Sequence, residues 1–344
     1  MAYTNIDDPS AHFYAYAFSK SSGTGSVTFD ANSDLQPDFL WVKSGTNEDS
    51  HELWDSTKGV NSTLFSDSTS AEDTAANRLV SFDTDGFTWG NAGNLNAAGN
   101  FASWAWKANG GTTSSNTDGT ITSTIQANTD AGFNIVTYTG NGSNSNFGHG
   151  MGEQPDMVIV KNRDSTANWC VWHKGLTSSY YLQLDTNISQ QTGPWDGLDP
   201  SSGVVYVYSG GLVNASGSDY VAYIFKGKQG YSKFGKYTGN GSEDGTFIYT
   251  GFKPAFVIMK RIDAAGNWVM FDNKRDPSNV VYHRLFPNLT NSENTSRNYI
   301  DLLSNGIKYR GYWPDHNASG GTYIYMAFAE NPFVTSTGVP TTAR

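Results

Sequence analysis

The sequence predicts an all-β protein built from tandem antiparallel β-sandwich or jelly-roll modules. Three observations predict this fold class: a segment that recurs three times, short strands of alternating side chains between glycine- and asparagine-rich turns, and an unusual composition. The 344 residues include 19 tyrosines, 19 phenylalanines and 10 tryptophans but only 16% charged residues. This mixture is typical of all-β secreted or virion proteins rather than of helical enzymes.

The recurring segment begins with a proline, continues as an apolar strand and ends on a lysine. Its copies are QPDFLWVK (36–43), QPDMVIVK (154–161) and KPAFVIMK (253–260). Proline is tolerated as the first residue of a strand because that residue need not donate a ladder hydrogen bond. An aromatic residue and then a polar residue stand seventeen and eighteen positions after each proline. These pairs are Trp54 and Asp55, Trp172 and His173, and Phe271 and Asp272.

A second segment follows each proline strand, where an asparagine opens a turn and an aromatic strand. The strings are NAAGNFASWAW, NASGSDYVAYIF and NASGGTYIYMAF. Their asparagines, which lie 59, 59 and 63 residues after the three prolines, are Asn96, Asn214 and Asn317. Two motifs in so constant a register indicate an internal repeat of about 100 residues, a common domain size.

The repeat divides the chain into modules. We predict module 1 at 1–110, a linker and first strand at 111–132, module 2 at 133–229, module 3 at 230–330 and an extended C-terminal tail at 331–344. The string ANGGTTSSNTDGT (108–120) suggests the linker because it consists of small polar residues. FNIVTYTGNGS and FGKYTGNGS open modules 2 and 3, whereas module 1 has SSGTGSVTFDANS in that place. Helix is expected only in short turns, as in SAEDTAA at 70–76.

The strand after each proline is almost continuously apolar, which indicates a strand covered on both faces or a sandwich core. The strand NWCVWHKG (168–175) alternates, with Trp169 and His173 on one face and Cys170 and Trp172 on the other. Aromatic residues therefore occupy both faces. As the only cysteine, Cys170 cannot form an intrachain disulfide, and we expect it to be a small buried core residue.

The aromatic-plus-polar pairs are the first candidate ligand-binding residues. An aromatic face beside a carboxylate or imidazole can hold a sugar, which assigns ligand binding to Trp54, Asp55, Trp172, His173, Phe271 and Asp272. The alternative is that the polar residue ends a strand and caps the next turn. Asn96, Asn214 and Asn317 likewise admit two interpretations, as glycan-contacting loop residues or as turn residues that set hairpin register.

Other polar residues admit simpler explanations. Lys43, Lys161 and Lys260 can form an anion site with nearby arginines, but closing a strand at the solvent edge is the more common role of such lysines. Asp30, Asn32 and Asp34 offer alternating oxygens as calcium loops do, without the glycine and distal glutamate of the helix-loop-helix pattern. Asp83 and Asp85, and Glu243 and Asp244, are adjacent carboxylates in hairpin contexts rather than a glycosidase pair. We therefore expect no catalytic residue, metal or cofactor.

Charge and hydropathy exclude two partner classes. A formal net charge of −10 without a Lys/Arg cluster disfavours nucleic acid and anionic membranes. No apolar run approaches the roughly 20 residues that span a bilayer, and the N-terminus MAYTNIDDPSAHFYAYAF lacks the basic and apolar parts of a signal peptide.

Several long strings resemble a family of uncharacterised repeat proteins encoded by marine bacteriophages and cyanophages. They are NIDDPSAHF, NGGTTSSNTDGTITSTIQAN, GYSKFGKYTGNGSEDGTFIYTGFKPAFVIMKR and AENPFVTSTGVPTTAR, and the resemblance covers essentially the whole chain. It implies tail-fibre-like virion proteins with concanavalin-type, lectin-like sandwich modules, and it carries no catalytic motif.

The resemblance implies a non-enzymatic protein on the virion surface, made in the infected bacterial cytoplasm. Three functions follow in order of preference: recognition of host-surface polysaccharide from a tail fibre, tail tip or capsid appendage; structural decoration of capsid or tail without a ligand; and glycan depolymerisation. The expected partners are other virion proteins and further copies of the chain, with a trimer favoured because fibre and decoration proteins are usually symmetric oligomers.

Overall fold

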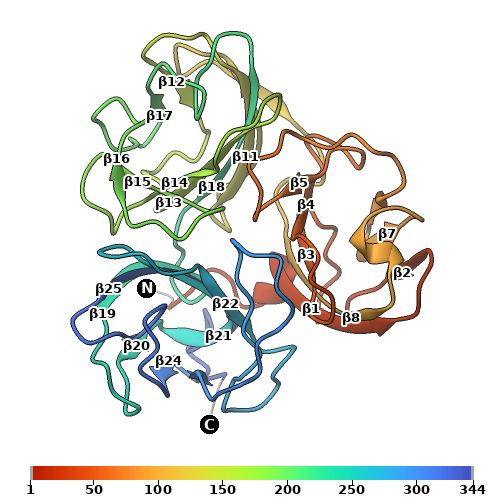
Figure 1. Ribbon diagram of the computed structural model, residues 1–344, viewed down its shortest axis with the longest axis vertical. Coiled ribbons are helices and arrows are strands. Elements are labelled where there is room, and N and C mark those ends of the chain that lie inside the picture. The colour runs from red at the N-terminus through yellow and green to blue at the C-terminus, as the bar shows by residue number, and fades with distance from the viewer. Residues whose placement is uncertain (1–2, 342–344) are drawn as a thin grey trace.

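The computed structural model describes residues 3–341 and confirms the all-β prediction. Its elements are β-strands in antiparallel sheets and two short 3₁₀ helices, η1 (Pro9–Ala11) and η2 (Asn94–Asn96). The chain forms three lobes around a common centre, coloured red to orange, yellow to green, and cyan to blue in Figure 1. Each lobe is one module, with a large sheet whose one face is covered by a small sheet.

Module 1 has a five-stranded sheet and a three-stranded sheet. The large sheet runs in the order β1 (Phe13–Lys20), β8 (Gly99–Trp106), β3 (Phe39–Ser44), β4 (Glu52–Asp55), β5 (Leu64–Phe65). The small sheet runs β2 (Gly25–Val27), β7 (Gly86–Trp89), β6 (Leu79–Asp83). Although module 1 lacks the string YTGNGS, its first strand pairs with the central strand β8 as in the other modules.

Module 2 has an eight-stranded sheet and a two-stranded sheet. The large sheet runs β16 (Gln191–Thr192), β15 (Tyr180–Gln183), β14 (Cys170–His173), β13 (Met157–Asn162), β18 (Asp219–Phe225), β11 (Phe133–Thr139), β10 (Ser123–Asn128), β9 (Ser114–Asn116). The small sheet pairs β12 (Ser145–Gly148) with β17 (Val204–Val207). Because β9 and β10 extend this sheet, part of the segment predicted as a linker is an ordered edge of module 2.

Module 3 has a four-stranded sheet and a three-stranded sheet. The large sheet runs β19 (Ser232–Thr238), β25 (Thr322–Pro332), β21 (Phe252–Arg261), β22 (Val269–Asp272). The small sheet runs β20 (Phe247–Tyr249), β24 (Gly306–Tyr309), β23 (Ile300–Leu303). After β25 the described part of the tail folds back on itself, with a bridge between Val334 and Pro340, so it is not simply extended.

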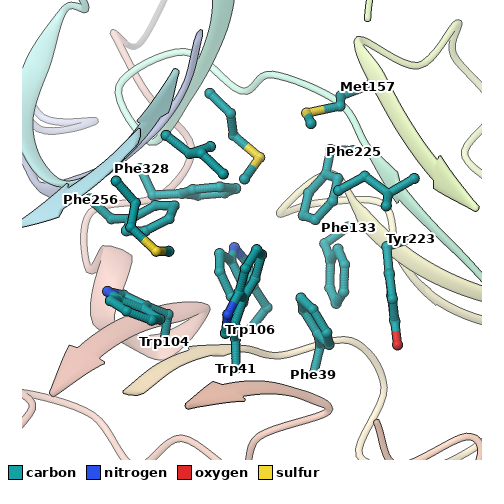
Figure 2. Close-up of a cluster of buried hydrophobic side chains, with 14 of the residues drawn as sticks. Phe39, Trp41, Trp104, Trp106, Phe133, Met157, Tyr223, Phe225, Phe256 and Phe328 are labelled. Atoms are coloured by element: carbon teal, nitrogen blue, oxygen red, sulfur yellow. The ribbon is translucent and has the colours of Figure 1, made fainter. Parts of the chain in front are cut away.

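Each large sheet is buried on both faces, which explains the continuous apolar strands. One face packs inside its own module, where Leu40, Val158 and Val257 belong to three separate clusters. The other face joins a single cluster in which all three modules take part. Figure 2 shows this central cluster, with aromatic side chains from the three large sheets converging between the lobes.

Three equivalent residues meet at the centre. The last residues of the three repeated sequence strings are Trp106, Phe225 and Phe328, on β8, β18 and β25, and their rings contact one another edge to face. The centroid distances are 6.3 Å for Trp106–Phe225, 5.6 Å for Trp106–Phe328 and 6.1 Å for Phe225–Phe328. A nearly equilateral triangle of equivalent positions marks a pseudo-threefold axis.

A cyclic set of backbone hydrogen bonds closes the ring of modules. A loop of each module donates one N–H to the carbonyl that follows the proline strand of the next. The three bonds are Glu72 to Arg163 (2.8 Å), Gln190 to Ile262 (3.0 Å) and Glu293 to Gly45 (2.9 Å). The helix predicted at 70–76 is therefore wrong, since this segment forms the loop between modules 1 and 2 and a bridge from Asp73 to Thr63.

Candidate functional site

The structure separates the two members of each aromatic-plus-polar pair. Trp54, Trp172 and Phe271 lie inside their own modules, whereas Asp55, His173 and Asp272 face neighbouring modules. Successive residues of a strand point to opposite faces, so one sugar cannot contact both members. All six side chains are also buried, at 3% exposure or less. Glycan binding at these pairs stays a prediction that their burial and separation do not favour.

The polar member of each pair bridges two modules. Tyr223 and Trp104 occupy equivalent positions on the central strands β18 and β8 and serve as donors to the two aspartates. The three contacts are the Tyr223 hydroxyl to Asp55 Oδ2 (2.8 Å), Trp104 Nε1 to Asp272 Oδ2 (3.2 Å), and His173 Nε2 with the carbonyl oxygen of Tyr325 (3.2 Å). Asp55 therefore connects module 1 to module 2, His173 connects module 2 to module 3, and Asp272 connects module 3 to module 1.

The same side chains also cap the turn that follows their strand. Asp55 Oδ1 accepts the backbone N–H of Lys58 at 2.9 Å, and His173 Nδ1 accepts that of Gly175 at 2.9 Å. Because Nδ1 accepts, the His173 proton lies on Nε2 and donates to Tyr325. Burial lowers the pKa of His173 to about 3, so the ring is neutral. These contacts fit the cap interpretation of the sequence.

The expectation that the three repeated lysines lie at solvent edges is wrong. Lys43, Lys161 and Lys260 are at most 1% exposed, and their ammonium groups donate to backbone carbonyls. Lys161 Nζ reaches Thr69 of module 1 at 3.0 Å, and Lys260 Nζ lies 3.5 Å from the carbonyl oxygen of Asn187 in module 2. Burial lowers the three pKa values to about 8, 8 and 7 respectively.

The repeated asparagines hold hairpins in modules 2 and 3. Asn214 and Asn317 are fully buried, and their Oδ1 atoms accept the backbone N–H groups of Asn141 (2.8 Å) and Asn240 (3.1 Å) in the YTGNGS turns. Asn96 is partly exposed, and its carbonyl accepts the N–H of Gly23 at 2.9 Å. These contacts fit turn residues that set the register; glycan contact at all three asparagines stays a prediction.

Asp30 of the calcium-like string contacts neighbouring side chains. Asp30 Oδ1 accepts the Tyr14 hydroxyl and lies 3.5 Å from Lys274 Nζ, beside a cavity between modules 1 and 3. Among residues 3–341 no group of three or more histidine, cysteine, aspartate or glutamate side chains is placed to hold a metal ion.

The sequence-adjacent carboxylates have local partners. Asp83 accepts the hydroxyls of Ser81 and Thr88, and Asp85 accepts the N–H of Leu35. Asp244 pairs with Lys308 at 2.7 Å. These contacts fit the hairpin interpretation. Cys170 is buried as expected, and burial raises the pKa of its thiol.

Sequence reasoning missed a cluster on module 3 that the other modules lack. Tyr312 is 58% exposed and stacks on Trp313 with an interplanar angle of 8°. The guanidinium of the exposed Arg297 lies 5.3 Å from the Trp313 ring centroid, and that of buried Arg284 lies 5.8 Å from it. One signal was visible: Asn317 stands four residues further from its proline than Asn96 and Asn214 do, so module 3 carries an insertion.

The fold and its internal contacts define a class: an all-β protein of three β-sandwich modules packed around one core. The chain belongs to the family described as Domain of unknown function (DUF7483), which it matches over residues 8–332. That single match extends across all three modules. No curated protein and no solved structure gives a significant match. None of the helices in the described part of the chain has the length and apolar character needed to cross a membrane.

Proposed function

We propose that this protein is a non-enzymatic surface component of a bacteriophage particle, carried on a tail fibre, tail tip or capsid appendage, where it contacts host-surface polysaccharide through its loops. The single observation that supports this proposal most is the closure of three modules on one core. Such a body keeps its loops in fixed relative positions, and loops on a rigid scaffold are the usual carriers of binding function. The resemblance of the long terminal and module-opening strings to phage proteins supports the location.

A binding role is supported over catalysis by the use of the buried polar groups. Asp55 and Asp272 bond to neighbouring modules, and Asp83 and Asp85 are engaged in a hairpin. Glycosidases place two carboxyl groups across an open cleft, with one acting as acid and the other as base or nucleophile. The repeated acidic positions of this chain instead stabilise contacts between modules.

Mass spectrometry of purified particles tests the proposal. We expect peptides from all three modules in particles that survive a density gradient, and antibody labelling at one fixed place on the particle. Absence of the chain from intact particles would remove the proposal. A glycan array with the purified chain then tests polysaccharide contact, and host-polysaccharide samples free of new reducing ends would support a non-enzymatic role.

The second candidate is a structural decoration protein without any ligand. The observation that favours it is the burial of the three aromatic-plus-polar pairs, which removes the most regular candidate ligand residues from the surface. An array without reproducible binding, together with particles that lose mechanical or thermal stability when the chain is missing, would select this alternative.

We further propose that the protein acts as a homo-oligomer, with a trimer favoured, since fibre and decoration proteins are usually symmetric oligomers. Light scattering of the purified chain measures this directly. A mass of three chains is the expected result, and a monomer at particle-relevant concentrations would contradict it.

A further inference from the structure

Module 3 carries a buried arginine without a full set of partners. The Arg284 side chain is 7% exposed, and its nearest carboxylate oxygen, Asp315 Oδ2, lies 3.8 Å from Nη1. Within residues 3–341 neither its Nε nor its Nη1 makes a hydrogen bond. A buried guanidinium that lacks hydrogen-bond partners is costly, because a charge removed from water must be compensated by pairing.

Aromatic rings surround this guanidinium. Its central carbon lies 4.4 Å from the ring centroid of Tyr299, 4.6 Å from that of Phe286 and 5.8 Å from that of Trp313. Ring faces attract the cation but cannot accept its in-plane N–H groups. The three rings therefore fix the plane of the Arg284 guanidinium. Its Nε and Nη1 donors remain without an acceptor among the described residues.

His316 adds unpaired donor capacity beside Arg284. It is fully buried, and neither ring nitrogen has a hydrogen-bond partner within the described residues. Burial, together with the charge of Arg284, lowers the pKa of His316 to about 3. The neutral ring still carries one N–H, so it adds a hydrogen-bond donor without repelling the charge of Arg284.

The sandwich does not need a charge at this position. Leu64, Leu182 and Leu285 pair with equivalent residues of β4, β14 and β22, which aligns Arg284 with Thr63 of module 1 and Tyr181 of module 2. Thr63 is neutral, and its hydroxyl oxygen accepts the indole N–H of Trp54 at 2.8 Å. Two modules thus close the same layer with uncharged residues, and only module 3 places a cation there.

An exposed surface leads to this cation. Trp313 separates buried Arg284 from exposed Arg297, and Tyr312 extends the aromatic surface outward beside it. Arg310 is paired with Asp301, so on a chain with a net charge of −10 the cations at this surface are Arg284 and Arg297. Screening limits electrostatic effects to about 8 Å at physiological salt, so these local charges determine what binds here.

We propose that the surface of Arg297, Tyr312 and Trp313, with the buried Arg284 and His316 behind it, binds a carboxylate-bearing saccharide, such as a uronic acid residue of a bacterial polysaccharide. The planar carboxylate pairs with the guanidinium N–H donors of exposed Arg297 and with the small exposed part of the Arg284 guanidinium, which match its geometry. The apolar face of the sugar ring lies on Trp313 and Tyr312, as saccharides do on aromatic platforms. The inference rests on the glycan-contact part of the proposed function and supplies its ligand class.

Isothermal titration calorimetry of the full chain tests the proposal in 0.15 M NaCl. The probes are tri-galacturonic acid, a glucuronic-acid-containing oligosaccharide and a sialyl-oligosaccharide, each compared with its neutral methyl ester. We expect saturable binding of at least one acid, with its ester binding more weakly. Failure of every acid to bind, or equal binding of acid and ester, would overturn the proposal.

Two variants identify the site. Arg284→Met should weaken binding by roughly 10- to 150-fold, the effect of losing charge-assisted hydrogen bonds. Trp313→Ala, which removes a partly buried ring, should also weaken it, whereas Tyr208→Ala removes an exposed aromatic side chain from module 2 and should leave affinity unchanged. Unchanged affinity in Arg284→Met would contradict the assignment.

Stability measurements separate binding from folding. Arg284→Met should keep or raise the melting temperature, because an apolar side chain of similar length replaces a charge without full pairing. If Arg284→Met unfolds instead, the exposed Arg297→Ala serves as the test: weaker binding by a folded variant supports the site, and unchanged binding overturns it. Virion mass spectrometry is independent of these titrations, so failure of the virion assignment and failure of the saccharide site can be told apart.

Discussion

The hydroxyl of Tyr223 in module 2 donates a 2.8 Å hydrogen bond to Asp55 Oδ2 in module 1, and both residues are completely buried. Asp55 also pairs with Lys58 at 3.0 Å, with both side chains fully buried. The contact joins two segments that are distant in sequence and have no sheet in common. The polar member of a repeated motif thus serves to hold one module against the next.

Tyr223→Phe tests the energetic value of this contact. The substitution leaves a buried carboxylate short of one donor, so we expect the free energy of unfolding to fall by about 1.5–3 kcal/mol. Urea denaturation followed by far-UV circular dichroism measures the change. Tyr231→Phe is the matched control, because the buried Tyr231 hydroxyl has no hydrogen-bond partner within the described residues. Equal losses in the two variants would contradict a specific role for Asp55.

Trp106→Ala tests whether the centre couples all three modules. Removing a fully buried tryptophan that contacts Phe225 and Phe328 should lower the free energy of unfolding by about 3–5 kcal/mol. The whole chain should still unfold in one transition at a lower denaturant concentration, with fluorescence and circular dichroism coincident. Loss of module 1 structure alone, with modules 2 and 3 unfolding later, would show that the modules are independent.

Division of the chain tests the same coupling. A fragment of modules 1 and 2 (residues 1–229) exposes apolar faces that module 3 covers in the intact protein, including Phe13 and Trp104 against Phe256. We expect the fragment to aggregate or to bind a hydrophobic dye, and to recover a compact fold when co-expressed with residues 230–344. A monomeric fragment with its own cooperative unfolding transition would contradict this expectation.

The buried lysines predict an alkaline rise in stability. Burial lowers the pKa of Lys43, Lys161 and Lys260 from 10.5 to about 8, 8 and 7, so between about pH 7 and 9 these three groups bind fewer protons in the folded protein than in the unfolded chain. The free energy of unfolding therefore increases with pH in this window. Cys170 opposes the increase because burial raises its pKa, and buried tyrosines such as Tyr138, Tyr223 and Tyr309 oppose it above about pH 9 for the same reason, so the rise is expected between about pH 7 and 9.

Denaturation between pH 7 and 9 measures this dependence. The slope should be positive in the natural chain and smaller after Lys161→Met, while Lys236→Met, which removes an exposed lysine, should leave the slope unchanged. A stability that is flat or falls across this range would show that the three ammonium groups keep ordinary pKa values inside the protein.

Much of the fold could be predicted because the repeat places equivalent strands and turns at matching distances along the chain. The apolar strands near the three prolines, the aromatic-plus-polar strands and the alternation of Trp169 and Cys170 on opposite faces agree with the structure. Pro254, however, does not open its strand but lies inside β21 at a register shift. Aromatic residues on both faces were already a sign of burial on both sides. The shared core was not predicted, since periodicity reveals that a face is buried but not which module covers it.

The candidate site was harder to predict because the same residue types serve binding and internal pairing. Lys161 was expected at a solvent edge, yet its ammonium lies among carbonyl groups that come together only when modules 1 and 2 pack. Arg284 could not be predicted as a site residue, because a single arginine in VYHRLF has no motif around it. Its significance depends on ring contacts and unpaired donors that only the three-dimensional structure reveals.

The cyclic hydrogen bonds from Glu72, Gln190 and Glu293 have a consequence for biosynthesis. The bond from Glu293 back to Gly45 joins module 3 to module 1, so the ring cannot close until Glu293 has left the ribosome. At about 5–20 residues per second, the earlier modules wait several seconds with their inward faces uncovered. Translation speed and chaperone supply, rather than the intrinsic stability of any one module, should therefore set the yield of native protein.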